Sequence, residues 1–305
     1  MTDKKCRICG CTDCKRCVKR WGLEHPCQWA EIDLCSICKT TVTSFVSIKG
    51  GVGRTNIVIL LAKCLASSGK RVLLIDSDLN NSLSFHFLNE ETIKKTKILN
   101  IAKALNDESN NLCDYSVSTT SPGIDLIAST PYLADLRTLS EKRLKRMIPT
   151  LYGKYDILIN DCPPTYDNIV LNAVNAADYT ITPVLKDLFS FNAVDFLANV
   201  LPRDVQNFKN WFVMVNGYDK RFEESKASKQ QEYINLYENG EYPMTPKETW
   251  LPWTSQIRLI VDFHKNLTRV KGPTGAVYNP VLYNAVAELA GCFFPNEELT
   301  IPEVF

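Results

Sequence analysis

The sequence has no long hydrophobic run and almost no net charge. No stretch of about 18 consecutive apolar residues occurs, which excludes an ordinary transmembrane helix. The first residues are rich in cysteine and lysine where a secretory signal would place an apolar core, so we expect a cytoplasmic protein that does not bind membranes. A formal net charge of +1 excludes a global attraction to nucleic acid. Any nucleic-acid-binding surface must be a local patch.

Internal repeats and low-complexity tracts are also absent. A chain of 305 residues with 45% hydrophobic and 23% charged residues has the composition of an ordinary globular protein. This length suffices for one large α/β domain with a small appendage, or for two modest domains.

Cysteine, in contrast, is concentrated at one end. Eight of the twelve cysteines precede residue 39, at Cys6, Cys9, Cys11, Cys14, Cys17, Cys27, Cys35 and Cys38. A cytoplasmic compartment keeps thiols reduced, so we interpret this cluster as metal ligands in place of disulfides. So short a segment cannot build a stable core without such a clamp. We therefore predict a cysteine-rich metal-binding module over residues 1–40 and a second domain over residues 41–305.

The cysteine spacing leaves the metal open. The outer pairs, Cys6 with Cys9 and Cys35 with Cys38, form a C-x₂-C…C-x₂-C frame that suits tetrahedral Zn²⁺. A second four-cysteine site would use the inner set, Cys11, Cys14, Cys17 and Cys27. The inner spacing also suits an iron–sulfur cluster, and a metal-free segment is the remaining alternative.

The same segment is basic before Trp21. Its basic residues outnumber its acidic ones, and they are Lys4, Lys5, Arg7, Lys15, Arg16, Lys19 and Arg20. A metal-stapled basic module would be able to contact nucleic-acid phosphates. A solvated charged face or a surface that docks a partner explains the same residues.

From residue 40 onward, strand and helix patterns alternate. The expected strands are Phe45–Ile48, Arg71–Ile75, Ile124–Ala128, Asp156–Asn160, Tyr179–Pro183, Trp211–Val215 and Thr249–Leu251. The expected helices are Asn56–Ala66, Ala134–Thr150, Asp167–Ala177, Asn192–Leu201 and Ser255–Leu267. Residues 39–43 are expected to be a polar joint, and residues 89–115 an only partly helical surface excursion. The alternation predicts an α/β fold with a doubly wound, mostly parallel sheet.

A glycine-rich turn follows the first expected strand, in the segment Lys49–Thr55. Gly50, Gly51 and Gly53 let the backbone approach a polyphosphate, and the following helix offers its positive dipole end to the same anion. Thr55 would place a hydroxyl on Mg²⁺. The alternative is a tight strand-to-helix turn without a ligand. In the pattern G-x-x-x-x-G-K-[ST], Arg54 stands where lysine is usual.

Three aspartates follow two other expected strands. Asp76 and Asp78 come after Arg71–Ile75, and Asp161 comes after Asp156–Asn160. Ligands of parallel sheets bind beyond the carboxyl ends of the strands, so these acids would converge near the glycine turn. One such acid is explained equally well as a helix cap, but three together indicate a Mg²⁺ and water site.

Three motifs in this order resemble those of the deviant-Walker ParA/MinD family of P-loop ATPases. They are KGGVGRT at Lys49–Thr55, LLIDSDLNNS at Leu73–Ser82 and YDILINDCPP at Tyr155–Pro164, and the resemblance covers roughly residues 43–295. It implies the P-loop fold, ATP and Mg²⁺ as cofactors, and a homodimer in the ATP state.

The resemblance also implies residue roles. The nucleotide would lie against Gly50, Gly51, Val52, Gly53, Arg54, Thr55 and Asn56. Thr55 and Asp161 would hold Mg²⁺ with support from Asp76, and Asp78 would orient the attacking water. Lys49 would reach across the dimer to the partner's phosphates. Asn216 would read the adenine, whose other side Pro252 would close; an ordinary turn is the alternative role for Asn216.

Two further expectations concern charge. Arginine at position 54 keeps the charge of the usual lysine but not its geometry, so we predict retained nucleotide binding and slow hydrolysis. By resemblance, a basic region on and beyond the expected helix Ser255–Leu267 would bind DNA without sequence preference, through Arg258, Lys265, Arg269 and Lys271. A solvated face is the alternative.

The predicted function is therefore an ATP-switched dimer that partitions or positions DNA or another cargo, associating with the nucleoid when ATP-bound. A ParB-like protein or cargo adaptor would stimulate hydrolysis. The alternatives are an ATPase that matures a nickel or iron–sulfur cofactor, and a regulator that senses ATP while hardly hydrolysing it.

Overall fold

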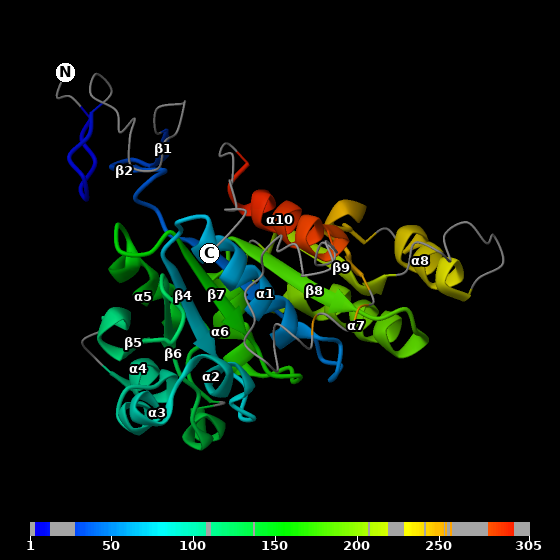
Figure 1. The fold of residues 1–305 in the computed structure, drawn as a ribbon, viewed down its shortest axis with the longest axis horizontal. Helices are drawn as coiled ribbons and strands as arrows, with labels where there is room; N and C mark the ends of the chain where they lie inside the picture. The colour runs from blue at the N-terminus through cyan, green and yellow to red at the C-terminus, as the bar shows by residue number, and fades with distance from the viewer. Residues whose placement is uncertain are drawn as a thin grey trace, which may run out of the picture.

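The computed structural model describes residues 4–12, 28–107, 111–136, 138–206, 208–218, 229–240, 242–252, 254, 257 and 280–295. Its centre is an eight-stranded sheet with the order β10-β9-β8-β3-β7-β4-β6-β5, in which only the short edge strand β5 is antiparallel. The strands are β3 Thr41–Phe45, β4 Val72–Asp76, β5 Val117–Ser118, β6 Ile124–Ile127, β7 Ile157–Asp161, β8 Tyr179–Val184, β9 Trp211–Tyr218 and β10 Leu251–Pro252. The predicted α/β class with a mostly parallel sheet is confirmed (Figure 1).

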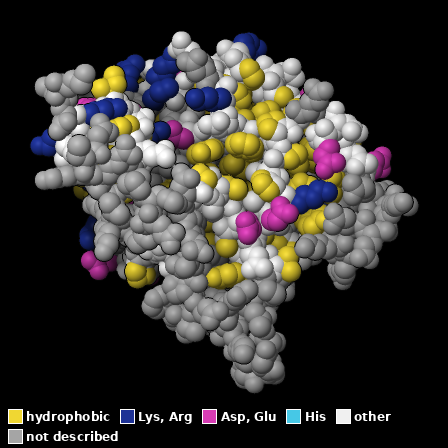
Figure 2. Space-filling view, turned by 90° about the horizontal axis from the view of Figure 1, so that it is seen from above, with side chains coloured by type: hydrophobic (Ala, Val, Ile, Leu, Met, Phe, Trp, Pro, Cys, Tyr) yellow, Lys and Arg dark blue, Asp and Glu magenta, His cyan; other side chains and the backbone are white. Residues whose placement is uncertain are grey.

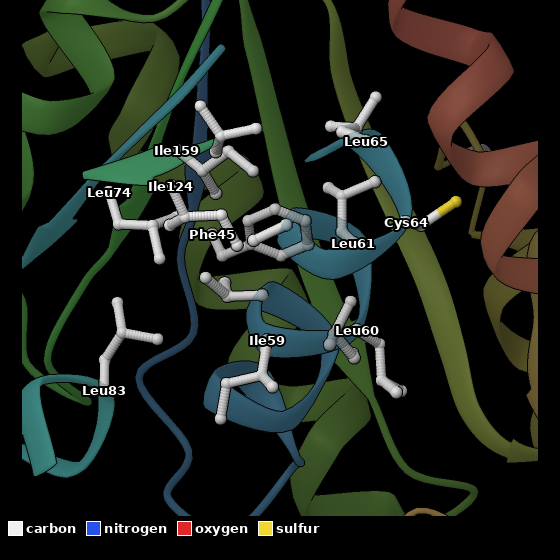
Figure 3. Close-up of a cluster of buried hydrophobic side chains, with 14 of the residues drawn as sticks. Phe45, Ile59, Leu60, Leu61, Cys64, Leu65, Leu74, Leu83, Ile124 and Ile159 are labelled. Carbon is white, nitrogen blue, oxygen red and sulfur yellow. The ribbon is translucent and has the colours of Figure 1, made fainter. Parts of the chain in front are cut away.

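Helices pack on both faces of this sheet. On one face, α1 (Arg54–Ser67) and α10 (Pro280–Phe293) share an apolar core with alternate residues of the central strands. Figure 3 shows Phe45, Leu74 and Ile159 of three neighbouring strands beside α1. The opposite face carries α5 (Arg143–Met147), α6 (Asn168–Ala176) and α7 (Leu188–Asp204). The sheet is therefore buried between two helical layers, as the near-continuous apolar strands require.

The start of the first core strand was predicted wrongly. We expected a polar joint over residues 39–43 and a strand over Phe45–Ile48, but β3 covers Thr41–Phe45. Thr43 and Ser44 of this strand are buried, and Ser44 Oγ donates to Ala173 O at 2.8 Å and accepts from Asn160 Nδ2 at 3.0 Å. Polar residues can fill a buried strand when their hydrogen bonds are satisfied inside the protein.

The single helix expected over Ala134–Thr150 is also wrong. The segment forms a 3₁₀ helix at Pro131–Leu136, the short helix α5, and a 3₁₀ turn at Ile148–Leu151. The Asn172 side chain accepts from Leu144 N at 3.0 Å and donates to Ser140 O at 2.9 Å. These bonds hold the chain in a turn before α5, and Pro149 lacks the N–H that would continue a helix after it.

Several elements were not foreseen. They are the hairpin β1 Trp29–Glu31 with β2 Leu34–Cys35, the helices α2 Ser82–Phe87, α8 Lys229–Asn239 and α10, and the edge strand β5. The partly helical segment 89–115 contains α3 Glu90–Thr96, α4 Ile101–Asn106 and a 3₁₀ turn at Leu112–Tyr115. The expected helix Ser255–Leu267 lies almost entirely outside the described residues. Among the helices that are described, none is both long and apolar enough to cross a membrane.

Candidate nucleotide site and cysteine cluster

The glycine turn lies between β3 and α1, at the carboxyl end of the parallel strands. β3 and β4 flank β7, and the register places Phe45 and Asp76 opposite Asp161 on either side. Gly51 and Gly53 have φ values of +75° and +84°, which residues with a side chain rarely adopt. The fold therefore brings the turn and the motif aspartates together, as the sequence predicted.

The end of β9 is joined to this turn through Asn216. Its Nδ2 donates to Val52 O at 2.8 Å. A Cβ added to Gly53 would lie only 2.2 Å from the same Nδ2, so glycine is required there by contact as well as by φ. Pro252 of β10 is in register with Tyr218 of β9, two residues beyond Asn216. Asn216 therefore lies beside the loop, and Pro252 lies on the neighbouring edge strand.

Arg54 places its guanidinium among the motif acids. Nε donates to Asp161 Oδ1 at 2.9 Å, Nη2 donates to Asp78 Oδ2 at 3.3 Å, and Nη1 donates to Ser47 O at 3.2 Å. The Arg54 side chain is only 7% exposed. A guanidinium stays protonated at any physiological pH, so this buried cation neutralises part of the acidic cluster. Thr55 Oγ1 donates to the second oxygen, Asp161 Oδ2, at 2.6 Å.

Asp76 is fully buried beside Asp161. Its Oδ1 accepts from Asp78 N at 3.1 Å, and its Oδ2 accepts from Ser84 N at 2.9 Å and Ser84 Oγ at 2.7 Å. Burial, with the nearby Asp161 carboxylate, raises the pKa of Asp76 to about 7. Burial also raises the pKa of Asp161, although Arg54 and Thr55 act in the opposite direction. Two adjacent carboxyl groups whose pKa values are raised by burial favour a bound cation between them.

Lys49 is held within its own chain. Its ammonium contacts Asp187 Oδ2 at 2.5 Å and Ser190 Oγ at 3.1 Å. Asp187 is the N-cap of α7, where its other oxygen accepts from Ser190 N at 2.8 Å. Burial alone would raise the pKa of Asp187, but Lys49 and Ser190 hold that pKa below its ordinary value.

Sequence reasoning missed Asp187, Ser190 and Ser84 as members of this site. An aspartate three residues before a serine, at the start of an apolar run, is a helix N-cap signal that could have located α7's first turn. Its contact with Lys49 depends on β8 lying next to β3, which no local pattern reveals.

The outer cysteine pairs are brought together at the other end of the sheet. The Sγ atoms of Cys6, Cys9, Cys35 and Cys38 all lie within 4.8 Å of one another, and those of Cys9 and Cys35 are 3.7 Å apart. This cluster could hold a metal ion. Cys11 is buried nearby but does not belong to the group, and the other members of the predicted inner set, Cys14, Cys17 and Cys27, lie outside the described residues.

The four residues assigned to DNA, Arg258, Lys265, Arg269 and Lys271, also lie outside the described residues. Among the described side chains, Figure 2 shows lysine and arginine gathered mainly toward one side of the face seen from above, with apolar side chains near its middle. The DNA interface remains a prediction.

Comparison with known proteins decides the family. A family model described as an AAA domain matches residues 40–213, more than half of the chain. The chain belongs to this family, as a P-loop ATPase of the ParA/MinD type. It is 31% identical over 182 residues to the sporulation initiation inhibitor protein Soj of Bacillus subtilis, a match covering 58% of this chain and 70% of Soj.

Two further relatives extend the comparison. The chromosome partitioning protein ParA of Caulobacter vibrioides is 29% identical over 170 residues, which cover 53% of this chain and 62% of that protein. A putative plasmid partition protein from Borrelia burgdorferi, solved with AMPPNP bound, superimposes with a TM-score of 0.65 at 22% identity, covering 84% of this chain and 99% of that one. The latter likeness supports the fold alone.

Proposed function

We propose that this ParA/MinD-type ATPase is an ATP-switched dimer that partitions or positions plasmid, phage or chromosomal DNA, or another cargo. One observation carries the proposal: Arg54 and Thr55 of the glycine turn bond to the motif acids, and Lys49 of the same turn bonds to the N-cap of α7. The names of the Soj and ParA relatives, which concern sporulation and chromosome partitioning, support it.

The residues present fit ATP with Mg²⁺. The carboxylates of Asp161 and Asp76 and the hydroxyl of Thr55 are hard oxygen donors of the kind that Mg²⁺ prefers. When bound, the ion would neutralise charge on the phosphates. The loop from Gly50 to Asn56 would cradle those phosphates, Asp78 would orient the attacking water, and Asn216 and Pro252 would flank the base.

Lys49 is proposed to join two copies. In the present state it is paired with Asp187 and Ser190 of the same chain. A triphosphate presented by a second copy would offer more negative charge than one carboxylate, so Lys49 would exchange partners and clasp the dimer. ADP lacks the γ-phosphate and would leave Lys49 with Asp187.

Arg54 is proposed to slow hydrolysis. To reach the β- and γ-phosphates it must give up its contacts with Asp161 and Asp78, and a planar fork fits between phosphates less closely than an ammonium. We expect Arg54→Lys to raise steady-state phosphate release by about 10-fold, because better alignment of the reacting groups is worth that much or more. Equal rates for the two proteins would contradict this proposal.

The remaining assignments follow from the same proposal. Residues 1–40 form a metal-binding module and residues 41–305 the ATPase domain. The protein acts in the cytoplasm without binding membranes, and the ATP-bound dimer associates with the nucleoid through Arg258, Lys265, Arg269 and Lys271. A ParB-like or cargo adaptor protein stimulates hydrolysis. Because dimerisation creates a doubled basic surface, DNA affinity should depend on ATP.

Fluorescence anisotropy of a labelled DNA duplex of arbitrary sequence tests the DNA-binding part. With a nonhydrolysable ATP analogue we expect binding that weakens steeply with salt, and at least 10-fold weaker binding with ADP. Arg258→Glu should weaken binding and flatten the salt dependence while leaving ATP affinity unchanged. Glu91→Lys, on an exposed helix face, is a charge-change control that should not reproduce this loss. Identical binding in both nucleotide states would exclude a DNA-positioning switch.

We propose zinc as the ion of the cysteine cluster. A tetrahedral Zn²⁺ with bonds of about 2.3 Å places its sulfurs about 3.8 Å apart, close to the 3.7 Å between Cys9 and Cys35. All four sulfurs lie within 4.8 Å of one another, which supports a single ion over a cluster whose cysteines bind different iron atoms. Metal analysis of a colourless protein should find zinc. A brown protein absorbing near 400 nm would favour the alternative, a cofactor-maturation ATPase.

A nucleotide-sensing regulator is the second candidate, and the buried Arg54–Asp161 pair favours it. Such a protein would bind ATP and dimerise but release phosphate at a rate that neither DNA nor an adaptor changes. Turnover that rises severalfold with DNA and a cargo partner would support the positioning ATPase in its place.

A further inference from the structure

The two Cys-x-x-Cys turns of the N-terminal segment have matching backbone hydrogen bonds. We call the described residues 4–12 and 28–40 the cysteine module, and the described residues from Thr41 onward the ATPase body. After Cys6, Gly10 N donates to Cys6 O at 2.9 Å; after Cys35, Lys39 N donates to Cys35 O at 3.2 Å. Cys35 N also donates to Cys6 Sγ at 3.5 Å. Each turn thus presents its two sulfurs toward the other.

Apolar burial within the module is small. Its buried apolar cluster consists of Leu34 and the cysteines Cys6, Cys11, Cys35 and Cys38, with Trp29, Ile37 and Tyr152 packed against it. Leu34 is therefore the only fully buried aliphatic side chain in this cluster of described residues. Such a cluster cannot offset the entropy of ordering the segment, so the sulfurs need a further bond to hold the two turns together.

The module docks on the turn between α5 and β7 of the ATPase body. Gly153 N donates to Cys38 O at 2.8 Å, so a cysteine of the metal cluster is bonded directly to the body. Ile8, between Cys6 and Cys9, covers Gly153 so closely that a Cβ there would lie 2.5 Å from Ile8 Cγ2. Gly153 has a φ of +75°. Both Cys-x-x-Cys turns therefore contact the same residue of the body.

Tyr152 forms the second half of this contact. The Arg7 guanidinium lies 5.7 Å from the centre of the Tyr152 ring, and the Tyr152 hydroxyl donates to Glu31 Oε1 at 3.3 Å. Arg7 is in turn paired with Glu31 at 2.9 Å and with Asp33. Arg7, one of the basic residues considered for nucleic-acid contact, is thus engaged by Glu31, Asp33 and Tyr152.

The module also continues directly into the first core strand. Lys39 Nζ contacts Asp178 Oδ1 at 2.7 Å, Thr40 Oγ1 donates to Tyr155 O at 2.8 Å, and Thr41 N donates to Asp156 O at 3.0 Å. Between Cys38 and β3 every residue is therefore bonded to the ATPase body.

We propose that a single tetrahedrally coordinated metal ion, bound by Cys6, Cys9, Cys35 and Cys38, clamps the cysteine module onto the Tyr152–Gly153 turn and thereby stabilises the ATPase body. The ion joins the upstream turn, which carries Arg7 and Ile8, to the downstream turn, which leads into β3. The module is then a structural clamp on the N-terminal end of the sheet. This inference concerns the metal and the dock, and it stands whether or not the ATPase positions DNA.

Removing two ligands tests the metal site. The double variant Cys6→Ser with Cys9→Ser is compared with Cys292→Ser, an exposed cysteine on α10. Elemental analysis should find one metal ion per chain in the wild type and in Cys292→Ser, and at least a fivefold loss in the double variant. The melting temperature of the double variant should be lower by about 5 °C or more. It is followed by the far-UV signal, to which the ATPase body contributes most. Loss of metal without a change in melting temperature would overturn the clamp, and absence of metal from the wild type would overturn the site.

Tyr152→Ala separates docking from metal binding. The four thiols remain, so the variant should keep one metal ion per chain. Stripping the metal with a thiol-specific mercurial should then lower its melting temperature by less than half of the drop seen in the wild type. An undiminished drop would overturn the dock. Should this variant not fold, Tyr152→Phe, which removes only the hydroxyl contact with Glu31, should give a smaller reduction in the same direction.

Hydrogen exchange locates the effect. In the wild type, metal removal should increase deuterium uptake in the peptide around Gly153, whose N–H donates to Cys38 O. ATP affinity, measured below the melting temperature, should change less than about twofold, because the nucleotide site lies at the other end of a strand about 16 Å long. Unchanged exchange at Gly153 would contradict the clamp, while a lost ATP site alone would leave it standing.

Discussion

Four thiols lie near the N-terminal ends of the parallel strands of the central sheet. Carboxylates, a threonine hydroxyl and a glycine turn lie at the carboxyl ends of these strands. The five residues of β3 connect the two regions. Soft sulfur ligands suit an ion that stays in place, and hard oxygen ligands suit an ion that arrives and leaves with a nucleotide. We therefore expect the cysteine end to serve stability and the glycine-turn end to serve ligand exchange.

The ion pairs of the two regions also differ. Around the cysteines, Arg7 is paired with Glu31 and Asp33 within the module, and Lys39 is paired with Asp178 of the body. Around the glycine turn, Arg54 is paired with Asp161, an acid proposed to hold Mg²⁺, and Lys49 is paired with the α7 N-cap Asp187. Under the proposed function, a nucleotide would take the place of these acids as the partner of Arg54 and Lys49.

Asp161→Asn should produce the largest difference between the two ends. It removes a proposed ligand for Mg²⁺ and leaves the Arg54 guanidinium short of a buried partner. We expect phosphate release to fall at least about 100-fold, while the metal content of the cysteine cluster stays unchanged. Asp204→Asn, which weakens an acceptor of Arg203 and of the Tyr166 hydroxyl, is the control and should keep normal turnover. Retention of half the wild-type rate by Asp161→Asn would break the comparison.

Gly53→Ala should act on ATP affinity. An alanine at position 53 would have to adopt a φ of +84°, and its Cβ would lie 2.2 Å from Asn216 Nδ2. The turn must therefore shift away from the phosphates. We expect affinity measured by calorimetry to fall at least about 10-fold. Gly291→Ala in α10, where nothing lies within 4 Å of the new Cβ, should leave affinity unchanged. Equal affinities for the two variants would show that the turn does not hold the nucleotide.

Asp76→Asn should change the pH dependence of stability without nucleotide. The folded-state pKa of Asp76, about 7, is above its unfolded value. The contribution of this carboxyl to the free energy of unfolding is therefore present at low pH and is lost as pH rises toward and through 7. Between pH 5 and pH 8 the free energy of unfolding of the variant should gain about 2–3 kcal/mol relative to the wild type. Urea unfolding at both pH values measures this difference. A constant difference would show that Asp76 is ionised throughout.

Asp178→Ala should affect stability but not nucleotide binding, as expected for the N-terminal end. Asp178 accepts from Lys39 Nζ and from Val42 N at 3.0 Å, so its loss leaves a strand N–H without this partner. We expect a loss of about 1–2 kcal/mol in unfolding free energy. Glu91→Ala, which removes an exposed helix pair, should cost less than about 0.5 kcal/mol. A weakened ATP affinity in Asp178→Ala would mean that the two ends are coupled.

Much of this arrangement could be predicted from sequence, and the rest fails for identifiable reasons. The glycine turn and the aspartates were located because their motifs directly follow apolar strands. The outer cysteine pairs were found by spacing alone. The partner of Lys49 is 138 residues away, and its contact depends on strand order. The Gly153 contact depends on how a turn with a positive φ meets a distant cysteine loop. The start of β3 was missed because its polar residue Ser44 is bonded to Ala173, a partner distant in the chain.

The most direct test of the central claim is the mass of the protein in solution with each nucleotide. Light scattering coupled to size-exclusion chromatography should give twice the chain mass of 34.5 kDa with a nonhydrolysable ATP analogue and Mg²⁺, and one chain mass with ADP. Lys49→Ala should remain monomeric in both states while still binding ATP. A nucleotide-independent mass, or a Lys49→Ala protein that dimerises as the wild type does, would contradict the account.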